Sequence, residues 1–415
     1  MGGSHRPAGM RRAGRGIRRR GCPPPARAGG AAGWTQGFYE RHDAGARLAA
    51  EARRRFLAAT VERGEAGMDL AEAALAVAAE DDALVTGSVV PLPVEAYLQR
   101  LEKMVDELAS KRLAHLDAAA AAPRDVLDVV DAYLFGEKRF RVPVSGRSKL
   151  ERGLVIVNPG CYEDAAHAYL HQVLQRRVGC PAAIAIVYGQ VLKKLLERGV
   201  VDFAVRMDCI DPDARPAPVV LEGLGRAALV RDGVATNTVT SEVLREVLRL
   251  LKRAYWPFAW DTRGRDAGTG GGFMAAAAAL TTRRAAATAG EEAIARTAKH
   301  RLSRGIWTST GAGDRVRAKA AVERLALLCG ATDPVEYRDA AVILCHCGEP
   351  DVAKVLLDEY VESPHFARSA EPEREQVRDL LAVLPPDAGA ADGRAAGELL
   401  AGVRAQERTG LDIPW

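Results

Sequence analysis

The segment between Pro181 and Gly199 constrains the fold of this chain more than any other part of the sequence. Its apolar residues recur at the three- and four-residue spacing of a buried helical face, at positions 184, 187, 188, 191, 192, 195 and 196. Proline fits the first turn of a helix, and glycine fits the position just after its end. The pattern predicts a helix over about 181–197, with Cys180 directly before its first turn.

Apolar residues at helical spacing recur on both sides of that segment, and in one stretch apolar and polar residues alternate instead. Helices are expected over 42–60, 69–80, 94–108, 123–134, 164–177 and 241–256. Residues 203–209 alternate as a half-buried strand does, and 218–222 and 226–231 are further strand candidates. Residues 137–162 are expected to form a loop with short strands.

Four shorter helical patterns follow, near 315–329, 334–346, 350–362 and 371–384. Gly330, Gly348 and Pro364 separate them, so the turns between them are short. Short helices with short turns are typical of antiparallel helical hairpins. The predicted fold class is α+β, a mainly helical core with a small antiparallel sheet followed by a helical-repeat tail.

Length and cysteine usage exclude several classes of protein. A chain of 415 residues is long enough for two or three domains and buries a core without disulfides. Its seven cysteines are an odd number without a repeated spacing, which favours a reducing compartment over a secreted disulfide framework. No apolar run reaches the length of a membrane-spanning helix, so no membrane association is expected.

The first 34 residues differ from the rest of the chain in charge. They contain eight arginines and no acidic residue, which leaves 50 Lys and Arg against 54 Asp and Glu in the remainder. That remainder lacks the net positive charge typical of nucleic-acid binding, and no nucleic-acid partner is expected for it. The arm suits a chloroplast or mitochondrial transit peptide. A disordered tail, a mispredicted start and a nucleic-acid-binding arm are the alternatives.

Two further segments resemble a phosphate-binding loop and a zinc site at first sight, but each lacks the features that such a site requires. Gly268–Phe273 follows no predicted strand and lacks the Gly-Lys-Ser/Thr ending of a phosphate-binding loop, so residues 261–312 are expected to be a mobile, Gly/Ala-rich insertion. Cys345 and Cys347 point to nearly opposite sides of a helix, so with His346 they fit buried structural residues better than a four-ligand zinc site. No cofactor and no metal are expected.

The order of these segments, with several motifs inside them, resembles the SirB family of transglutaminase-like proteins. Residues 69–78, 94–101 and 131–136 resemble the family's leading segments. The densest likeness lies in 162–188, where the family reads Tyr-x-Asp, Asn-Ser-Tyr-Leu, Val-Leu and Arg-Arg-x-Gly-Ile-Pro. Residues 249–255, 337–340 and 348–364 resemble its later segments. The likeness covers roughly 66–260 and 313–385.

The resemblance implies a papain-like core joined to a tetratricopeptide-like tail. The expected organisation is a basic disordered arm (1–34), a transglutaminase-like domain with leading helices (35–260), the low-complexity insertion (261–312), a tetratricopeptide-like helical region (313–385), and a C-terminal helix and tail (386–415).

Transglutaminase-like chemistry uses a cysteine thiolate, a histidine and an acid, because a free thiol is mostly protonated at neutral pH. Cys180 has the right local context at the start of a helix, although the common family pattern has isoleucine there. Asp202 stands where the family usually has its histidine, and a carboxylate activates a thiol poorly. His167 and His171, one turn apart on the expected 164–177 helix, are the remaining candidates for a base beside Cys180.

Two functions follow from the resemblance. The first is a non-catalytic protein, a pseudoenzyme, that binds a protein partner through residues 313–385 and takes no small-molecule substrate. Its expected location is the chloroplast, with the mitochondrion or cytoplasm as alternatives. The second is a cysteine-dependent acyltransferase or amide hydrolase that uses Cys180. A third idea, a degradation adaptor, lacks the F-box-like segment it requires.

Overall fold

Local sequence signals set the ends of most helices in the computed structural model. The model describes residues 30–86, 88–115, 121–143, 146–149, 155–158, 164–209, 214–225, 230–231, 234–235, 241–256, 271–281, 314–329 and 332–385. The expected arm up to residue 29, most of the expected insertion and residues 386–415 therefore lie outside the described residues.

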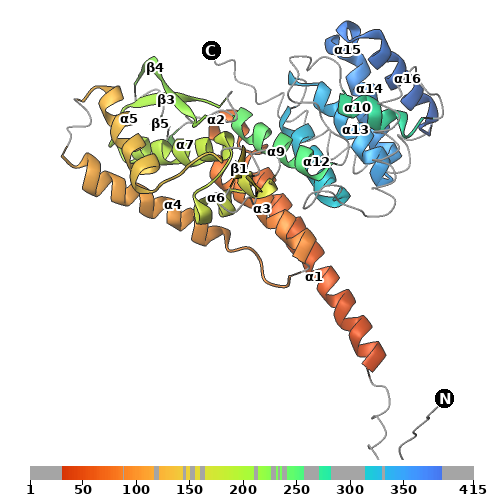
Figure 1. Ribbon diagram of the computed structural model, residues 1–415, viewed down its shortest axis with the longest axis horizontal. Coiled ribbons are helices and arrows are strands. Elements are labelled where there is room, and N and C mark those ends of the chain that lie inside the picture. Colours follow the sequence, from red (N-terminus) through yellow and green to blue (C-terminus); the bar gives the residue numbers. More distant parts are fainter. Residues whose placement is uncertain are drawn as a thin grey trace, which may run out of the picture.

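The N-terminal part of the chain forms a pair of long helices. Helix α1 (Gly30–Ala59) begins well before the expected residue 42, because no proline interrupts its Ala-, Arg- and Glu-rich sequence. After the short α2 (Gly64–Gly67), helix α3 (Leu70–Thr86) packs along the second half of α1. The first half of α1 extends away from the rest of the molecule (Figure 1).

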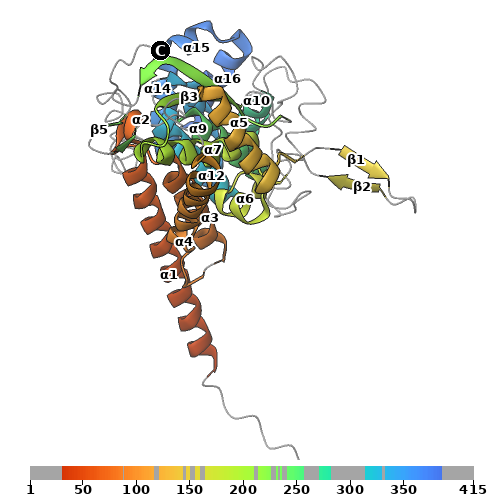
Figure 2. The same ribbon diagram turned by 90° about the vertical axis from the view of Figure 1, so that its left-hand side faces the viewer.

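The next elements form the core, a name we use for residues 94–208. The core begins with α4 (Val94–Leu108), η1 (Ala109–Leu113), α5 (Pro123–Asp131) and η2 (Ala132–Glu137). It continues through β1 (Gly146–Lys149), β2 (Val155–Asn158), η3 (Ala165–His167), α6 (Leu170–Arg176), α7 (Pro181–Glu197) and β3 (Phe203–Asp208). Strands β1 and β2 form an antiparallel hairpin that projects from the molecule (Figure 2).

The sheet beside α7 is small and antiparallel. Strand β3 pairs with β4 (Ala217–Gly225), which is longer than the expected 218–222. Strands β5 (Val230–Arg231) and β6 (Val234–Ala235) form a further short pair, and β6 contacts α7. The predicted α+β class, mainly helical with a small antiparallel sheet, is confirmed.

Helix α9 (Glu242–Tyr255) leads from the sheet to the C-terminal helical region, the name used here for α12–α16. That region contains α12 (Arg315–Cys329), α13 (Val335–Cys347), α14 (Pro350–Glu362), α15 (Pro364–Arg368) and α16 (Glu371–Val383). Gly348 ends α13 with a φ of +87°, a backbone conformation that glycine adopts without strain. Pro364 opens the short α15, which the sequence pattern did not predict. Helix α10 (Gly271–Ala278) lies within the expected insertion and packs on α13 and α16.

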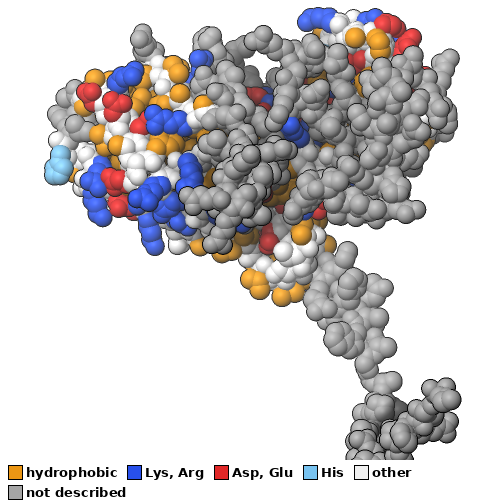
Figure 3. All heavy atoms as spheres, in the orientation of Figure 1, with side chains coloured by type: hydrophobic (Ala, Val, Ile, Leu, Met, Phe, Trp, Pro, Cys, Tyr) orange, Lys and Arg blue, Asp and Glu red, His pale blue; other side chains and the backbone are white. Residues whose placement is uncertain are grey.

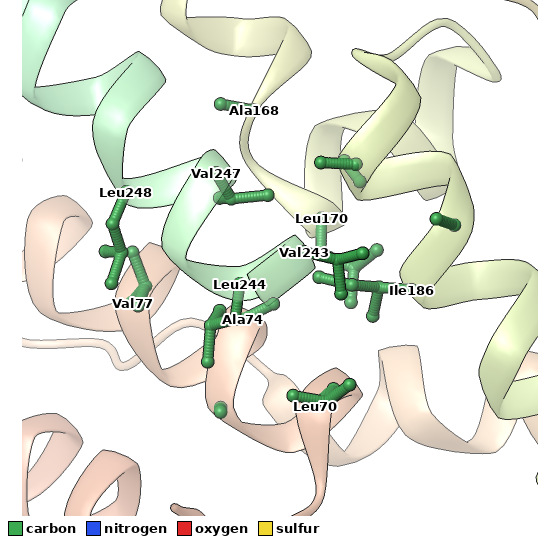
Figure 4. Packing of buried hydrophobic residues seen from close by; sticks show 14 of the residues in the cluster. Leu70, Ala74, Val77, Ala168, Leu170, Ile186, Val243, Leu244, Val247 and Leu248 are labelled. Atoms are coloured by element: carbon green, nitrogen blue, oxygen red, sulfur yellow. The ribbon is translucent and has the colours of Figure 1, made fainter. Parts of the chain in front are cut away.

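One continuous apolar cluster joins the core to the C-terminal helical region. Figure 4 shows its middle, where side chains from α3, α7 and α9 meet. Leu244 and Leu248 of α9 are completely buried there, Leu248 beside Val77 and Leu244 beside Ala74 of α3. Helix α9 also packs along α12, so it contributes to both parts.

A chain of buried polar contacts crosses the same boundary. Arg324 of α12 is completely buried, and its Nη2 donates to the Oδ1 of Asp81 in α3 at 2.9 Å and lies 2.8 Å from the Oε2 of Glu80. Arg53 of α1 donates to both carboxylate oxygens of Glu80 from its Nε, each at 3.0 Å. The other oxygen of Asp81, Oδ2, accepts a hydrogen bond from the Tyr169 hydroxyl at 2.6 Å. Removing water from these charges is costly, so each charge depends on its partners.

A second buried cluster links α9 to α13 and α16. Lys252 donates to Glu336 at 2.6 Å and to Asp339 at 3.1 Å, and all three side chains are at most 8% exposed. Arg338 connects Asp339 with Glu373, which also accepts from the Tyr360 hydroxyl at 2.6 Å. Each charged side chain of this cluster therefore has at least one oppositely charged partner.

Candidate functional site

Cys180 occupies the N-cap of α7, as the Gly-Cys-Pro sequence predicts. Its extended backbone, with φ −64° and ψ 156°, aims Sγ at the first turn, where it accepts a hydrogen bond from the Ala183 backbone N–H at 3.4 Å. The residue is 0% exposed to solvent. The thiol thus caps a 17-residue helix from inside the core.

Backbone contacts fix the position of Cys180 from two directions. Its own N–H donates to the carbonyl of His167 at 2.8 Å, and the N–H of Gly179 donates to the carbonyl of Arg141 at 3.1 Å. A side chain has no room at position 179, because an added Cβ would lie 2.6 Å from Cγ2 of Val173 and 3.3 Å from the His167 carbonyl. Glycine is required here by close packing.

Substituting Gly179 with alanine should therefore lower the free energy of unfolding by about 2–3 kcal/mol. The Val173→Ala substitution should relieve most of the clash, so the double variant should lose at least about 1 kcal/mol less than the sum of the single losses. Chemical denaturation of the four proteins measures this coupling. Strictly additive losses would show that Val173 does not limit the space at Gly179.

The segment before α6 breaks where the sequence predicted one continuous helix over 164–177. Asp164 caps the short η3 turn through its carboxylate, which accepts from the Ala166 N–H at 2.9 Å, and α6 begins only at Leu170. Tyr169 lies between them with an extended backbone, and its hydroxyl meets both Asp81 and the Tyr255 hydroxyl at 2.6 Å. These buried hydrogen bonds replace the helical turn that local propensity favours.

As a result, His167 and His171 belong to different elements and do not share one helical face. His167 ends the η3 turn, is 8% exposed and supplies the carbonyl that holds the Cys180 N–H. The structure thus brings the backbone of His167 to Cys180, a contact that the sequence analysis did not predict.

His171 has its own polar and aromatic surroundings. Its ring lies between Tyr97, at a centroid distance of 6.0 Å, and Tyr169, at 5.8 Å. Nε2 pairs with the Gln172 side-chain amide at 2.9 Å, and the buried Nδ1 has no hydrogen-bond partner among the residues that the structure describes. Burial, and then the nearby Arg176, lower the pKa of His171 to about 4. His171 is therefore neutral at physiological pH, and neither ring nitrogen bonds to Cys180.

Acidification should destabilise the protein through His171. The folded chain keeps this residue neutral down to pH about 4, whereas the ordinary pKa of histidine is 6.5, so the unfolded chain binds more protons between these values. The stability from neutral His171 is complete above pH 6.5 and is lost as the pH falls towards about 4.

Because part of the ring faces solvent, we expect His171 to account for about 1–2 kcal/mol of the stability lost between pH 7 and pH 5. The His171→Gln variant should lack this contribution when both proteins are unfolded with denaturant at the two pH values. Identical pH dependence in variant and wild type would contradict this assignment.

Asp202, at the position where the resembling family usually has histidine, is exposed and directly precedes β3. It is the exposed member of a segment whose neighbours, Val201 and Phe203, are buried.

Cys345, His346 and Cys347 end α13. Burial raises the pKa of the Cys345 thiol to about 12 and that of Cys347 to about 11, so both thiols are protonated at neutral pH. The Nε2 of His346 lies 2.9 Å from the Ala276 carbonyl of α10, and its ring meets Trp256 at 5.4 Å. Across the described part of the chain, no group of three His, Cys, Asp or Glu residues has the geometry of a metal site. In the same residues, no helix is long and apolar enough to cross a membrane.

The buried ion pairs were not among the sequence predictions, although a signal for them exists. Glu80 and Asp81 follow Ala73, Ala74 and Val77 at helical spacing, so they continue the apolar face of α3. Arg324 continues the apolar face of α12 in the same way, four residues after Ala320. Opposite charges on two apolar faces indicate buried partners rather than solvated ones.

Comparison with known families finds a match in the middle of the chain. Residues 95–204 match the family described as the Transglutaminase-like superfamily, and they carry a domain of that superfamily. The match runs from α4 into β3 and includes Cys180, His167, His171 and Asp202. Searches of curated proteins and of solved structures returned no significant match.

Proposed function

We propose that this chain is a non-catalytic transglutaminase-like protein that acts in protein–protein interaction or regulation. The observation that carries this proposal is the state of Cys180. Its side chain is 0% exposed and its Sγ accepts the N–H of Ala183, so the thiol serves as a helix cap where a nucleophile would need access to a substrate.

Two of the other candidate site residues, His171 and Asp202, support the same conclusion. The pKa of His171 is lowered to about 4 by burial, and its Nε2 is engaged by Gln172. Asp202 is exposed and acidic, at the position where the family that the sequence resembles usually has histidine. Neither residue is suited to take a proton from Cys180 at neutral pH.

The proposed partner surface is the C-terminal helical region. Its successive helices α12, α13 and α14 pack against one another, an arrangement that suits a tetratricopeptide-like role in a SirB-type protein. Helix α15 has no buried residue and, with the start of α16, offers exposed side chains such as Arg368 and Glu375. We place the protein in the chloroplast on the composition of residues 1–34, read as a transit peptide.

Deleting the helical region is not a clean test of partner binding. Removing α12 would leave Glu80 and Asp81 buried without Arg324, so the rest of the protein would lose stability as well. The test therefore uses the full chain with exposed substitutions. Arg368→Glu combined with Glu375→Arg changes the surface of α15 and α16 and keeps the net charge.

The second variant is Cys180→Ser, which removes the thiol and keeps an oxygen that caps a helix well. A protein that co-purifies with the wild type, and rebinds after separate purification, should be retained by Cys180→Ser. The same protein should bind the double surface variant at least about tenfold more weakly. Loss of binding with Cys180→Ser and retention with the surface variant would contradict the proposal.

The alternative is a cysteine-dependent acyltransferase or amide hydrolase. One observation favours it: Cys180 lies at the N-terminus of a 17-residue helix, whose dipole stabilises a thiolate. This function requires the thiol to become accessible, so it predicts rapid alkylation of Cys180 in the native protein. The proposed function predicts strong protection.

A further inference from the structure

Two short segments that run beside each other next to Cys180 bring together an unusual number of basic residues. The N–H of Arg141 donates to the Arg177 carbonyl at 3.0 Å, and the Gly179 N–H returns to the Arg141 carbonyl at 3.1 Å, which pairs Arg141 with Val178 as a parallel bridge. The Nη1 of Arg177 donates to the Lys138 carbonyl at 2.6 Å. Residues 138–141 and 176–179 are thus held side by side.

Three arginines of this cluster, Arg139, Arg141 and Arg176, are exposed. Among the residues that the structure describes, none of the three side chains forms a salt bridge, and the charge of Arg176 contributes to the lowered pKa of His171. Two acids that contact or precede this segment bind other residues, because Glu107 binds Lys138 at 2.5 Å and Glu137 binds Arg112 at 2.8 Å. Most other described arginines, such as Arg198 with Asp106, do have such a partner.

The backbone of the same cluster is strained. Among the described residues other than glycine, a positive φ occurs at Arg139, with 59°, and at Arg177, with 60°. Arginine has no local advantage in this conformation, which glycine adopts freely. At Arg177 the left-handed conformation ends α6, with the Arg177 N–H donating to the Val173 carbonyl, so it also fixes where the chain leaves the helix towards Gly179.

We infer that Arg139, Arg141 and Arg176 form a binding surface for a carboxylate-rich segment of a partner protein. The planar guanidinium group binds carboxylates through two parallel hydrogen bonds, and three exposed arginines on two adjacent segments match a short run of Asp or Glu. Figure 3 shows Lys and Arg side chains interspersed with Asp and Glu on the face of the core over α4, where pairs such as Arg198 with Asp106 lie.

Carboxylates fit this surface better than a single-stranded nucleic acid. Single strands are bound by stacking their bases on exposed aromatic rings, yet the exposed large hydrophobic residues in the described part of the chain are all leucine or valine. Phe140, inside the cluster, is 4% exposed and faces the core.

This surface belongs to the core and is separate from the proposed partner surface on α15 and α16, so its test is independent of that proposal. The probe is a peptide of ten glutamates, added to the full chain. The basic arm of residues 1–34 could bind the same peptide, so the measurement must report on the cluster alone. Hydrogen–deuterium exchange of residues 138–143 and 175–180 does so.

The test variant is Arg139→Asn with Arg141→Gln and Arg176→Gln. Asparagine tolerates positive φ, and Arg177 is kept because it bonds to the Lys138 carbonyl. The matched control removes three exposed arginines from other places, Arg47, Arg124 and Arg206, each to glutamine. Both variants lose the same charge.

The wild type and the control should show peptide-dependent protection of both segments with equal affinity. The cluster variant should bind the peptide at least about tenfold more weakly at these segments, and Arg141→Gln alone about threefold. Absence of protection in the wild type, or equal weakening in both triple variants, would overturn the inference. Protection by an RNA decamer at a tenfold lower concentration than the peptide would also overturn it.

Discussion

Replacing Arg324 with methionine should cost about 3–5 kcal/mol of unfolding free energy, the largest effect that we expect from one substitution. The guanidinium group is 0% exposed and contacts two buried carboxylates, Glu80 and Asp81. Methionine has a similar length but leaves Asp81 without an ionic partner in the apolar interior. The loss comes mainly from that stranded charge rather than from the attraction removed.

Urea denaturation of the full chain measures this effect. A matched control is Arg374→Met, which removes an arginine from a partly exposed contact with Glu371 on one helix and should cost less than about 0.5 kcal/mol. Equal losses in both variants would show that the Arg324 contacts are not energetically special.

The stranded-charge explanation makes a stricter prediction. Combining Arg324→Met with Glu80→Gln and Asp81→Asn removes the buried carboxylates together with their partner. This triple variant should recover about half of the stability that Arg324→Met loses, because uncharged amides cost less to bury than charges. A further loss instead of a recovery would contradict the explanation.

Replacing Lys252 with methionine should have the second largest effect, about 3 kcal/mol. The Lys252 ammonium is 8% exposed and donates to both Glu336 and Asp339. These two acids raise the pKa of Lys252 despite its burial, so the group stays charged in the folded protein. The loss is smaller than for Arg324, because Arg249 still binds Glu336 and Arg338 still binds Asp339.

Lys354→Met is the matched control for Lys252. Lys354 binds Asp358 one turn away on α14, and the Asp358 side chain is 48% exposed, so its removal should cost less than about 0.5 kcal/mol. Thermal and urea unfolding of both variants test the difference. A Lys252→Met loss within the range of the control would mean that the cluster contributes little.

The sequence predicted best those elements that depend on their own residues. Helix α7 begins at Pro181 and ends at Glu197, as the proline, the apolar spacing and Gly199 indicate. Helices α9, α12, α13 and α14 likewise agree with prediction to within one residue at each end. In each of these cases capping signals and apolar periodicity favour the same structure.

Elements that depend on distant residues were predicted less well. The break between η3 and α6 arises because the Tyr169 hydroxyl bonds to Asp81, which lies 88 residues earlier in the chain. No local pattern around Tyr169 contains that information. The same holds for His171, whose pKa is lowered by burial that only the packed structure provides.

In the candidate site, too, the features that depend on neighbouring residues were predicted and those that depend on packing were not. The position of Cys180 before a helix follows from its neighbours, whereas its complete burial and the bond of its N–H to the His167 carbonyl are features of the packed structure. The strained arginines 139 and 177 were not predicted, because a positive φ at arginine has no sequence signal.

The most direct test of the account is the alkylation rate of Cys180 in the native full chain. Iodoacetamide labelling is followed by mass spectrometry from pH 6 to pH 9, and the rate is compared with that of the urea-unfolded protein. Because the thiol is 0% exposed, we expect labelling at least about 100-fold slower in the native state, equivalent to an opening free energy of about 2.7 kcal/mol. Rapid native labelling with an apparent pKa below about 7 would contradict the non-catalytic account and favour a reactive thiol.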